Sequence, residues 1–382
     1  MAHHNTVFAQ LLKFISRHEF EGLAKRHHRG QRLRKTSRWS QFVAMALGQL
    51  SGRTSLRDIE SNLLAQSTRL YHIGTTGIAR SSLARLNEQQ PYTLYEALFA
   101  RLYRHCQHRA PKHGFRFKNK LYSLDASLID LSLKIFPWAH YALGKAAMKL
   151  HVGLDHEGHL PAFAAITHGH TSDMAFARTL NFPKASIVVC DKGYPDYAWF
   201  KALTEKGVFL ITRPRKNAVY RVITRHAVDQ RQGTTSDQII ELTGKTPRDI
   251  DMPVLRRIGY RDPSTGKHYV FMTNAFHLSA NTIADIYKSR WQIELFFKWI
   301  KQHLKIKAFI GNSRNAVLTQ IWIALCVYLL LAYVKFSSAL GVSLHTMLRL
   351  LQLNLFMRRN LLELLSNRPP DDDEKHNQLC LI

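Results

Sequence analysis

Cysteine is scarce in this sequence, and the cysteines it has are far apart. The 382 residues include four, none of them in a Cys-x-x-Cys pair: Cys106, Cys190, Cys326 and Cys380. This spacing excludes a disulfide framework and gives no pattern typical of a zinc site. Three of the four lie in apolar or mixed runs, as reduced thiols of a core do, so we expect a protein of a reducing cytoplasm.

Long apolar runs are also rare. The first residues, Met-Ala-His-His-Asn, lack the apolar segment of a signal peptide. The run Ile321 to Val334 is apolar for fourteen residues, whereas a membrane-spanning helix needs about 20. Thr319, Gln320 and Lys335 bracket this run closely. We therefore expect a helix buried in the fold and no membrane association.

Acidic residues are few compared with basic ones. The chain has 27 Asp and Glu against 54 Lys and Arg, a formal net charge of +27. A positive field of this size concentrates polyanions, and nucleic acid is the most common polyanion in a cell. A merely soluble surface or a ribosome-associated protein is an alternative, but an excess spread over the whole chain favours nucleic-acid binding.

Residues 1–115 are expected to form a helical, basic DNA-binding domain. The run Lys25–Arg38 is densely cationic, and it is compatible both with a solvated loop and with contacts to phosphates. Two helices, near 55–64 and 79–88, flank a glycine-bearing turn and resemble a helix-turn-helix, although such pairs are also common in proteins that bind no DNA. The second helix would present four side chains to a DNA groove: Arg80, Ser81, Arg85 and Asn87.

Residues 116–345 are expected to form an α/β domain. The predicted strands are 121–133, 149–154, 159–167, 186–190 and 208–212, and the predicted helices are 173–180 and 195–206. Three strands followed by alternating helices and strands are the order of a ribonuclease-H-like layer.

Two further segments complete the predicted organisation. Residues 214–276 interrupt the α/β order with β-prone pieces at 218–224, 252–260 and 268–273, which we interpret as a β-rich insertion. Residues 346–382 are expected to form a C-terminal helix and a disordered tail.

A long helix is predicted at 281–305, and its side chains separate into two faces. On a helical wheel of about 100° per residue, four side chains fall within an arc of about 60°: Tyr287, Arg290, Glu294 and Lys301. Lys298 and Lys305 extend the same stripe. The apolar residues cluster on a separate face. Such a stripe indicates a metal bound through Glu294 and phosphates bound through the cations.

One carboxylate cannot hold the metal ions that phosphoryl chemistry uses, and the chain offers two more. Asp125 lies in the middle of a predicted strand, where a charge is costly, and Asp191 directly follows the apolar strand that ends at Cys190. Carboxylates at strand ends are where α/β proteins place ligand sites. A buried structural Asp125 and a simple turn at Asp191 remain the alternatives.

Other acidic and histidine residues are better explained by structure. Strand alternation places Asp130 on the face opposite Asp125. Asp155 and Glu157 lie in a predicted hairpin turn, where such residues are ordinary. His168, His170 and Asp173 could resemble a metal cluster, but Asp173 also suits the start of a helix, and the structural explanation is favoured.

The spacing of these motifs resembles a known family. The pattern Tyr287-x-x-Arg290-x-x-x-Glu294-x-x-x-x-x-x-Lys301 is similar to the signature of the DDE transposases of the "IS-four" family of bacterial insertion sequences. Leu124-Asp125 resembles the family's first Asp strand, Cys190-Asp191-Lys-Gly193-Tyr194 its second Asp motif, and Lys149-Leu-His151 begins a hairpin that also fits. The resemblance covers roughly residues 118–336.

The resemblance implies a ribonuclease-H-like core in which Asp125, Asp191 and Glu294 bind two Mg²⁺ or Mn²⁺ ions. The protein would bind its element's terminal inverted repeats as a homodimer on the nucleoid, then cleave and join the double-stranded DNA to a target. The expected DNA contacts, including a flipped base stacked on tryptophan, are Tyr287, Arg290, Trp291, Lys298, Lys301, Lys305, Arg80 and Arg85.

Two other functions are compatible with the same motifs. A basic regulator with an inactive core would bind DNA without cutting it, although such a core need not retain all three carboxylates. A structure-specific nuclease of this fold would cut DNA without joining it.

Overall fold

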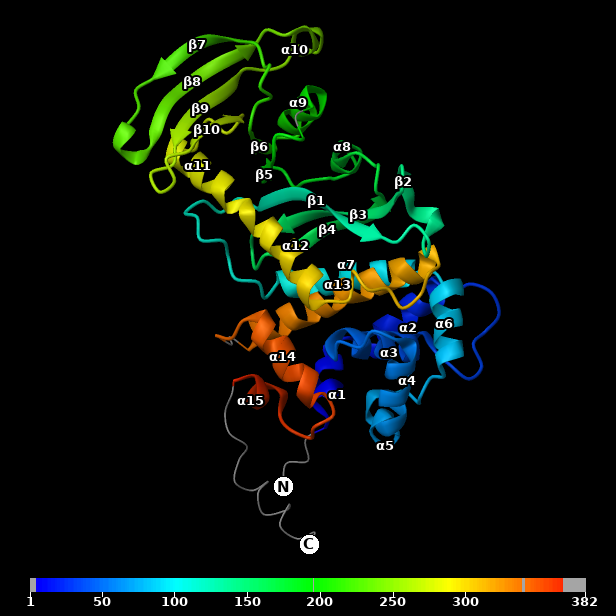
Figure 1. The fold of residues 1–382 in the computed structure, drawn as a ribbon. Coiled ribbons are helices and arrows are strands. Elements are labelled where there is room, and N and C mark those ends of the chain that lie inside the picture. The colour runs from blue at the N-terminus through cyan, green and yellow to red at the C-terminus, as the bar shows by residue number, and fades with distance from the viewer. Residues whose placement is uncertain (1–4, 195, 339–340, 367–382) are drawn as a thin grey trace. The chain divides into compact units, whose positions relative to one another are not determined.

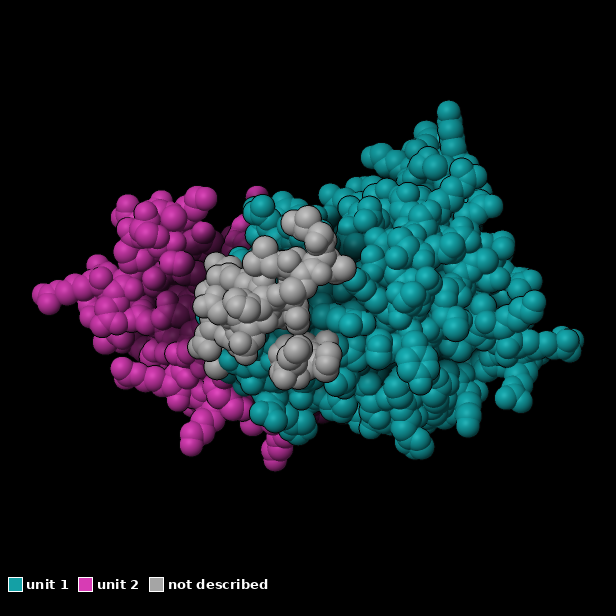
Figure 2. All heavy atoms as spheres, turned by 90° about the horizontal axis from the view of Figure 1, so that it is seen from below, with its two compact units in different colours: residues 1–111, 130–146, 298–382 teal, residues 112–129, 147–297 magenta. Residues whose placement is uncertain are grey.

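The structure, a computed structural model, describes residues 5–194, 196–338 and 341–366 (Figure 1). Two compact units make up the chain, and Figure 2 distinguishes them by colour. The helical unit is Met1–Pro111, Asp130–Ala146 and Lys298–Ile382; the sheet unit is Lys112–Ile129 and Ala147–Phe297. This division differs from the boundaries at 115 and 345 that the sequence suggested, because the C-terminal helices belong with the N-terminal ones. Cys380 and the predicted disordered tail lie outside the described residues.

The helical unit consists mainly of short amphipathic helices with serine caps. The Ser37, Ser55 and Ser313 hydroxyls each accept a hydrogen bond from a backbone N–H in the first turn of the helix that follows. Its elements are α1 (Val7–Leu12), α2 (Arg17–Arg26), α3 (Arg38–Leu50), α4 (Leu56–Ala65), α5 (Ser67–Leu70), η1 (Tyr71–Ile73), α6 (Arg80–Gln89), α7 (Thr93–Gln107), η2 (Pro137–Ala139), β2 (His140–Ala142), α13 (Arg314–Ser337), α14 (Leu344–Asn354) and α15 (Leu361–Leu365).

In this unit the prediction of a buried apolar helix is confirmed, whereas the prediction of a helix-turn-helix is not. Helix α13 contains the apolar run and is buried as expected: within the described residues it alone is long and apolar enough to cross a membrane, but 94% of its most apolar window is buried. The helices predicted near 55–64 and 79–88 are α4 and α6, but α5 and η1 separate them. No short turn therefore joins α4 to α6.

The sheet unit is built around one large mixed sheet, in the order β4-β3-β1-β5-β6-β10-β9-β8-β7 (Figure 1). Strand β5 pairs in parallel with β1 and β6, and the pairs β3–β4, β6–β10, β10–β9, β9–β8 and β8–β7 are antiparallel. The strands are β1 (Leu121–Leu131), β3 (Lys145–Asp155), β4 (Leu160–His168), β5 (Ile187–Cys190), β6 (Phe209–Thr212), β7 (Tyr220–His226), β8 (Thr234–Leu242), β9 (Leu255–Arg261) and β10 (His268–Thr273).

Helices cover both faces of this sheet. The remaining elements are α8 (Asp173–Ala177), α9 (Tyr197–Glu205), η3 (Gln230–Gln232), α10 (Lys245–Asp249), α11 (Ala280–Ser289) and α12 (Trp291–His303), of which the residues from Lys298 on belong to the helical unit. Because side chains alternate along a strand, Val188 and Cys190 share a core with α9, while Ile187 and Val189 share one with α11. The buried central strands hold the residues that follow them in fixed positions.

The structure adds to one prediction about the sheet unit and corrects another. The strands of the β-rich insertion extend the central sheet, because β10 pairs with β6, and β8 and α10 were missed. The predicted helix 281–305 is two helices, since Arg290 forms a turn between α11 and α12 and its N–H donates to Tyr287 rather than to Ile286. Helix α12 ends at His303, so Lys305 lies beyond it.

A buried charge cluster fixes the turn between β3 and β4. Asp155 is fully buried and Glu157 is 3% exposed. The Lys120 ammonium donates to both, at 3.1 Å from Asp155 Oδ2, and Lys112 Nζ lies 2.9 Å from Glu157 Oε1. Burial opposes ionisation of Glu157, but hydrogen bonds from Lys120 and Lys112 hold its pKa below the ordinary value.

Replacement of Lys120 by Met should therefore destabilise the protein by about 3–5 kcal/mol, because it leaves two buried carboxylates without their main cation. Urea denaturation at pH 7 measures this loss. Lys118, an exposed lysine of the same segment, provides the control, and Lys118→Met should change stability by less than about 0.5 kcal/mol. Equal losses in the two variants would contradict the role of the cluster.

The pH dependence of stability follows from the same contacts. Because the folded pKa of Glu157 is lowered, its contribution is present above the ordinary value of 4.5 and is lost as pH falls through the folded pKa. The pKa of Lys120 is raised by both carboxylates against the effect of burial, so its contribution persists up to the ordinary value of 10.5 and is lost at higher pH. The Lys120→Met variant should lose less stability than wild type on acidification.

Candidate active site

Asp125 lies on β1, and Asp191 directly follows the neighbouring strand β5 at the adjacent position. Strand β1 pairs in parallel with β5, and Leu124 is the partner of Cys190. The next residue of each chain segment is an aspartate, and neighbouring strands are about 4.8 Å apart. The sequence could place each aspartate at a strand, but the register brings the two together.

A tight turn fixes the Asp191 carboxylate. Its Oδ1 accepts a hydrogen bond from the Gly193 N–H at 2.7 Å, and its carbonyl oxygen accepts one from Thr212 Oγ1 at 3.1 Å. A Cβ at Gly193 would lie 2.9 Å from Asp191 Oδ1, so a side chain there would force the carboxylate to shift. The Asp-Lys-Gly segment is thus a turn, as one interpretation of the sequence held, and the turn also holds the carboxylate in position.

Gly193→Ala should displace the Asp191 carboxylate while leaving the fold intact. Displacement of a reacting group by about 1 Å can cost roughly 10²-fold in rate, so a 10- to 100-fold loss of DNA cleavage is expected. Gly114→Ala is the matched control, because nothing lies within 4 Å of the added Cβ. Thermal unfolding should be similar for both variants; a fully active Gly193→Ala protein would argue against a role for Asp191.

Arg290 connects the third carboxylate to the first. From the turn between α11 and α12, its Nη2 donates to Glu294 Oε1 at 2.6 Å, and its Nη1 lies 3.5 Å from Asp125 Oδ2. These side chains are largely but not fully buried, with 15% exposure for Arg290, 24% for Asp125 and 32% for Glu294. Asp125, Arg290 and Glu294 therefore form a chain of contacts at one edge of the sheet.

The electrostatics of this edge favour an additional cation. Burial, together with the charges of Asp191 and Glu294, raises the pKa of Asp125 to about 6, although the Ala126 N–H and Arg290 act in the opposite direction. One guanidinium thus compensates the carboxylates only in part. Two buried polar atoms here also have no hydrogen-bond partner in the described chain, Arg290 Nε and the Tyr194 hydroxyl.

Hard oxygen donors of this kind suit Mg²⁺ or Mn²⁺. Within the described part of the chain, however, no three His, Cys, Asp or Glu side chains are close enough together to hold one ion. The Arg290 guanidinium bridges Asp125 and Glu294. The donor chemistry therefore fits a divalent metal, while Arg290 is the cation that contacts two of the carboxylates.

Tyr287 lies between the Arg290 guanidinium and the ring of Phe271. The Arg290 Cζ is 5.9 Å from the centre of the Tyr287 ring, which in turn is 4.9 Å from that of Phe271. Burial raises the pKa of the Tyr287 phenol, and the charges of Arg290 and Arg213 oppose this.

Arg213 is a cation that sequence reasoning missed. It directly follows β6, and the pairing of Val189 with Ile211 brings it to the edge of the sheet where Asp191 lies. Its Cζ lies 5.5 Å from the centre of the Tyr269 ring. The parallel pairing of β5 and β6 was the signal that could have identified it.

The other predicted residues are not all in this unit. Trp291 is 56% exposed at the start of α12, as a residue that stacks on a base would be. Lys298, Lys301 and Lys305 belong to the helical unit, as do Arg80 and Arg85, which are exposed on α6. The expectation that Asn87 faces DNA was wrong: it is 2% exposed, and its Oδ1 accepts a hydrogen bond from Gln41 Nε2 at 2.8 Å.

Comparisons with known proteins give a consistent result. The family described as a transposase DDE domain matches residues 116–330, and a domain of unknown function matches residues 3–76. A Sinorhizobium fredii protein, y4zB, that carries the name of a transposase is 30% identical over 300 residues, 78% of this chain and 82% of its own. A Geobacillus stearothermophilus protein named for the transposase of insertion sequence element IS5377 is 28% identical over 255 residues, 66% of each chain.

Among solved structures, a piggyBac transposase synaptic complex with hairpin DNA aligns with 98% of this chain and 83% of that chain. The sequence identity is 9% and the TM-score is 0.45, which is too low to support an argument.

Proposed function

This chain belongs to the family of DDE transposases, enzymes that cleave DNA and transfer its strands, and we propose that Asp125, Asp191 and Glu294 are its metal-binding carboxylates. The observation that carries this assignment is the contact network at one sheet edge. The register of β1 and β5 makes Asp125 and Asp191 neighbours, and Arg290 joins Asp125 to Glu294. DNA and a divalent metal are the partners that the family requires.

The metal is proposed to be Mg²⁺, with Mn²⁺ as a substitute, and two ions per site. When bound, the ions would activate the attacking water or 3′-hydroxyl and stabilise the leaving oxygen. The raised pKa of Asp125 supports this proposal, because a buried carboxylate beside two others is stabilised by a divalent cation.

Arg290 is proposed to exchange partners during the reaction. Its guanidinium is the counter-ion of Asp125 and Glu294, and it would turn to a DNA phosphate when metal takes over the carboxylates. Its planar fork suits a phosphate as well as it suits a carboxylate. Tyr287 would limit this movement, because its ring lies beside the guanidinium.

The remaining DNA contacts are proposed from position and charge. Arg213 and Tyr287 would bind phosphates near the cleaved end, and Lys298, Lys301 and Lys305 would also bind DNA phosphates. Trp291 would stack on an unpaired or flipped base, for which its exposure is suitable.

The fold and assembly are proposed to be those of a ribonuclease-H-like transposase. The order β4-β3-β1-β5-β6, antiparallel at β3–β4 and then parallel from β1 to β6, supports the fold. The enzyme would act in the bacterial cytoplasm as a homodimer that synapses two terminal inverted repeats.

Purified full-length protein and a duplex from the DNA that flanks its gene test this function. Mg²⁺-dependent nicking followed by joining of the nicked end to a second duplex is the expected result. Binding without cleavage would indicate a regulator, and cleavage without joining would indicate a nuclease of the same fold; either outcome would overturn the proposal.

A further inference from the structure

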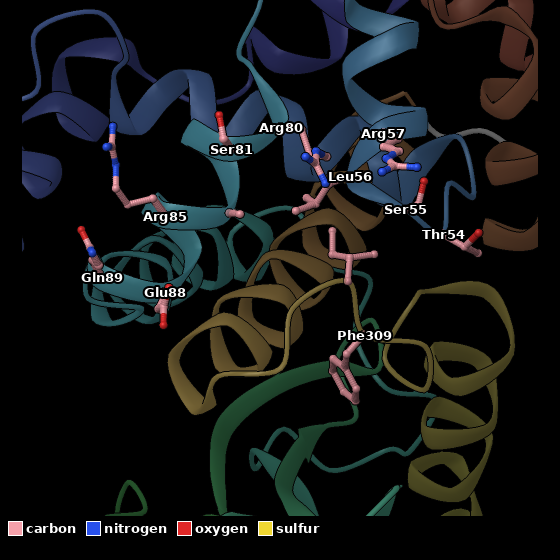
Figure 3. A pocket seen from close by; sticks show the side chains of 12 residues that line it. Thr54, Ser55, Leu56, Arg57, Arg80, Ser81, Arg85, Glu88, Gln89 and Phe309 are labelled. Carbon is pink, nitrogen blue, oxygen red and sulfur yellow. The ribbon is translucent and has the colours of Figure 1, made fainter. Parts of the chain in front are cut away.

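Helix α6 of the helical unit lies between two grooves. One, of about 810 Å³, separates α6 from the start of α4, and Figure 3 shows Arg80 and Arg85 of α6 and Arg57 of α4 lining it. The other, of about 940 Å³, separates α6 from the loop of residues 29–36, called the basic loop below. Glu88 and Gln89 line both grooves, as Arg85 does. The helix is thus a ridge with a hollow on each side.

The opposite face of α6 is fixed in the core of the unit. Leu83 and Leu86 are at most 4% exposed, and the buried Asn87 is hydrogen-bonded to Gln41 of α3. The first N–H of the helix, that of Arg80, donates to Glu60 Oε1 of α4 at 2.9 Å. The exposed face carries Arg80, Ser81, Ala84, Arg85, Glu88 and Gln89. This face can therefore contact a partner without any rearrangement of the helix.

The basic loop is tied to the end of α6 by one side chain. Gln90, which is 6% exposed, donates from Nε2 to the Arg29 carbonyl oxygen at 2.7 Å. Its Oε1 accepts from the Arg29 N–H at 3.3 Å and from Arg38 Nη1 at 3.1 Å. Both polar atoms of the buried amide are thus used to hold the loop beside the helix. A merely solvated loop would not need such an anchor.

The charge of the two grooves is almost entirely of one sign. Of the described residues that line them, Glu88 is the only acid. Among the described residues, none of the lining cations forms an ion pair, whereas Arg17 and Arg101 of the same unit pair with glutamates. The lining cations are Arg29, Arg32, Arg34, Lys35, Arg57, Arg80 and Arg85.

We propose that a B-form DNA duplex docks on this surface, with α6 in its major groove and its two phosphate backbones in the two grooves. A helix about 10–12 Å across fits a major groove about 12 Å wide. The basic loop and Arg57 would contact phosphates, which gives affinity, while Arg80, Arg85 and Gln89 would contact base edges, which gives specificity. This inference rests on the proposed function, because the duplex is the terminal repeat of the element. It gives a role to part of the domain of unknown function.

Binding assays in EDTA test the proposal, because without metal the DNA is bound but not cleaved. The probes are a duplex from the end of the element, a scrambled duplex of the same composition, and an RNA duplex of the terminal sequence. Combined replacement of Arg32, Arg34 and Lys35 by Ala should weaken the binding of both DNA duplexes about equally, by 10- to 100-fold. The slope of log K against log salt should become less steep by about 2–3, since each phosphate contact contributes about 0.9 to its magnitude.

Arg85→Ala should act differently: its affinity for the terminal duplex should fall about 10-fold, and its affinity for the scrambled duplex should fall less. Arg104, an exposed arginine of α7, provides the control, and Arg104→Ala should change the affinity for neither duplex. Thermal unfolding checks that each variant is folded.

Three results would overturn the docking surface. They are equal losses in Arg104→Ala and Arg85→Ala, an unchanged salt slope in the loop variant, or equal binding of the RNA duplex, whose major groove does not admit a helix. Failure of the proposed function would appear separately, as normal binding in EDTA without cleavage or joining in Mg²⁺.

Discussion

Glu294→Gln is expected to abolish DNA cleavage and strand transfer, with rates lower by roughly 10³-fold or more, while DNA binding in EDTA stays within about 2-fold of wild type. The substitution retains the shape of the side chain and removes the charge that a metal ion needs. Gel assays with a labelled terminal duplex measure all three steps.

A matched control separates this effect from a general change of charge. Glu205 is an exposed glutamate of α9 in the same unit, and its side chain is 63% exposed. Glu205→Gln should cleave and join like wild type. If Glu294→Gln kept more than about a tenth of the wild-type rate, Glu294 could not be a metal ligand.

Arg290→Met is expected to lower cleavage and joining by about 10²–10³-fold, because it removes the cation that would turn to the phosphate on which charge develops. It should also leave Asp125 and Glu294 without their shared counter-ion. The metal-free variant should therefore be less stable than wild type, and addition of Mg²⁺ should raise its melting temperature more than it raises that of wild type.

Two further variants make this second prediction specific. Arg290→Lys retains the charge but not the fork, so it should recover the stability without metal and only part of the activity. Arg178, an exposed arginine that pairs with Asp196, is the control, and Arg178→Met should affect neither Mg²⁺ response nor rate. A Mg²⁺ response of Arg290→Met no larger than that of wild type would contradict the exchange of partners.

The sequence predicted the carboxylates because they interrupt local patterns. Asp191 follows an apolar strand directly, and Asp125 is a charge within a strand; both deviations can be seen without a structure. Their adjacency depends on the pairing of β1 with β5, whose residues are more than sixty positions apart. Helical periodicity likewise predicted the stripe that contains Tyr287 and Glu294, but not the turn at Arg290 that lets one guanidinium contact two carboxylates.

The errors also have physical causes. Strand β8 begins Thr-Thr-Ser-Asp-Gln, and this polar half has no alternation of apolar residues that would predict a strand. Asp237 in this half is nevertheless buried, because it forms an ion pair with Arg256. Asn87 is polar yet points into the core, where a hydrogen bond to Gln41 satisfies it. The union of α13 with the N-terminal helices depends on long-range packing, which no local pattern records.

The most direct measurement is the anomalous scattering of Mn²⁺ in crystals of the protein bound to a terminal-repeat duplex. We expect manganese peaks with Asp125, Asp191 and Glu294 as ligands, and an Arg290 guanidinium that has left the carboxylates for a DNA phosphate. Manganese bound elsewhere, or an Arg290 that still bridges Asp125 and Glu294 in the metal-bound complex, would contradict this expectation.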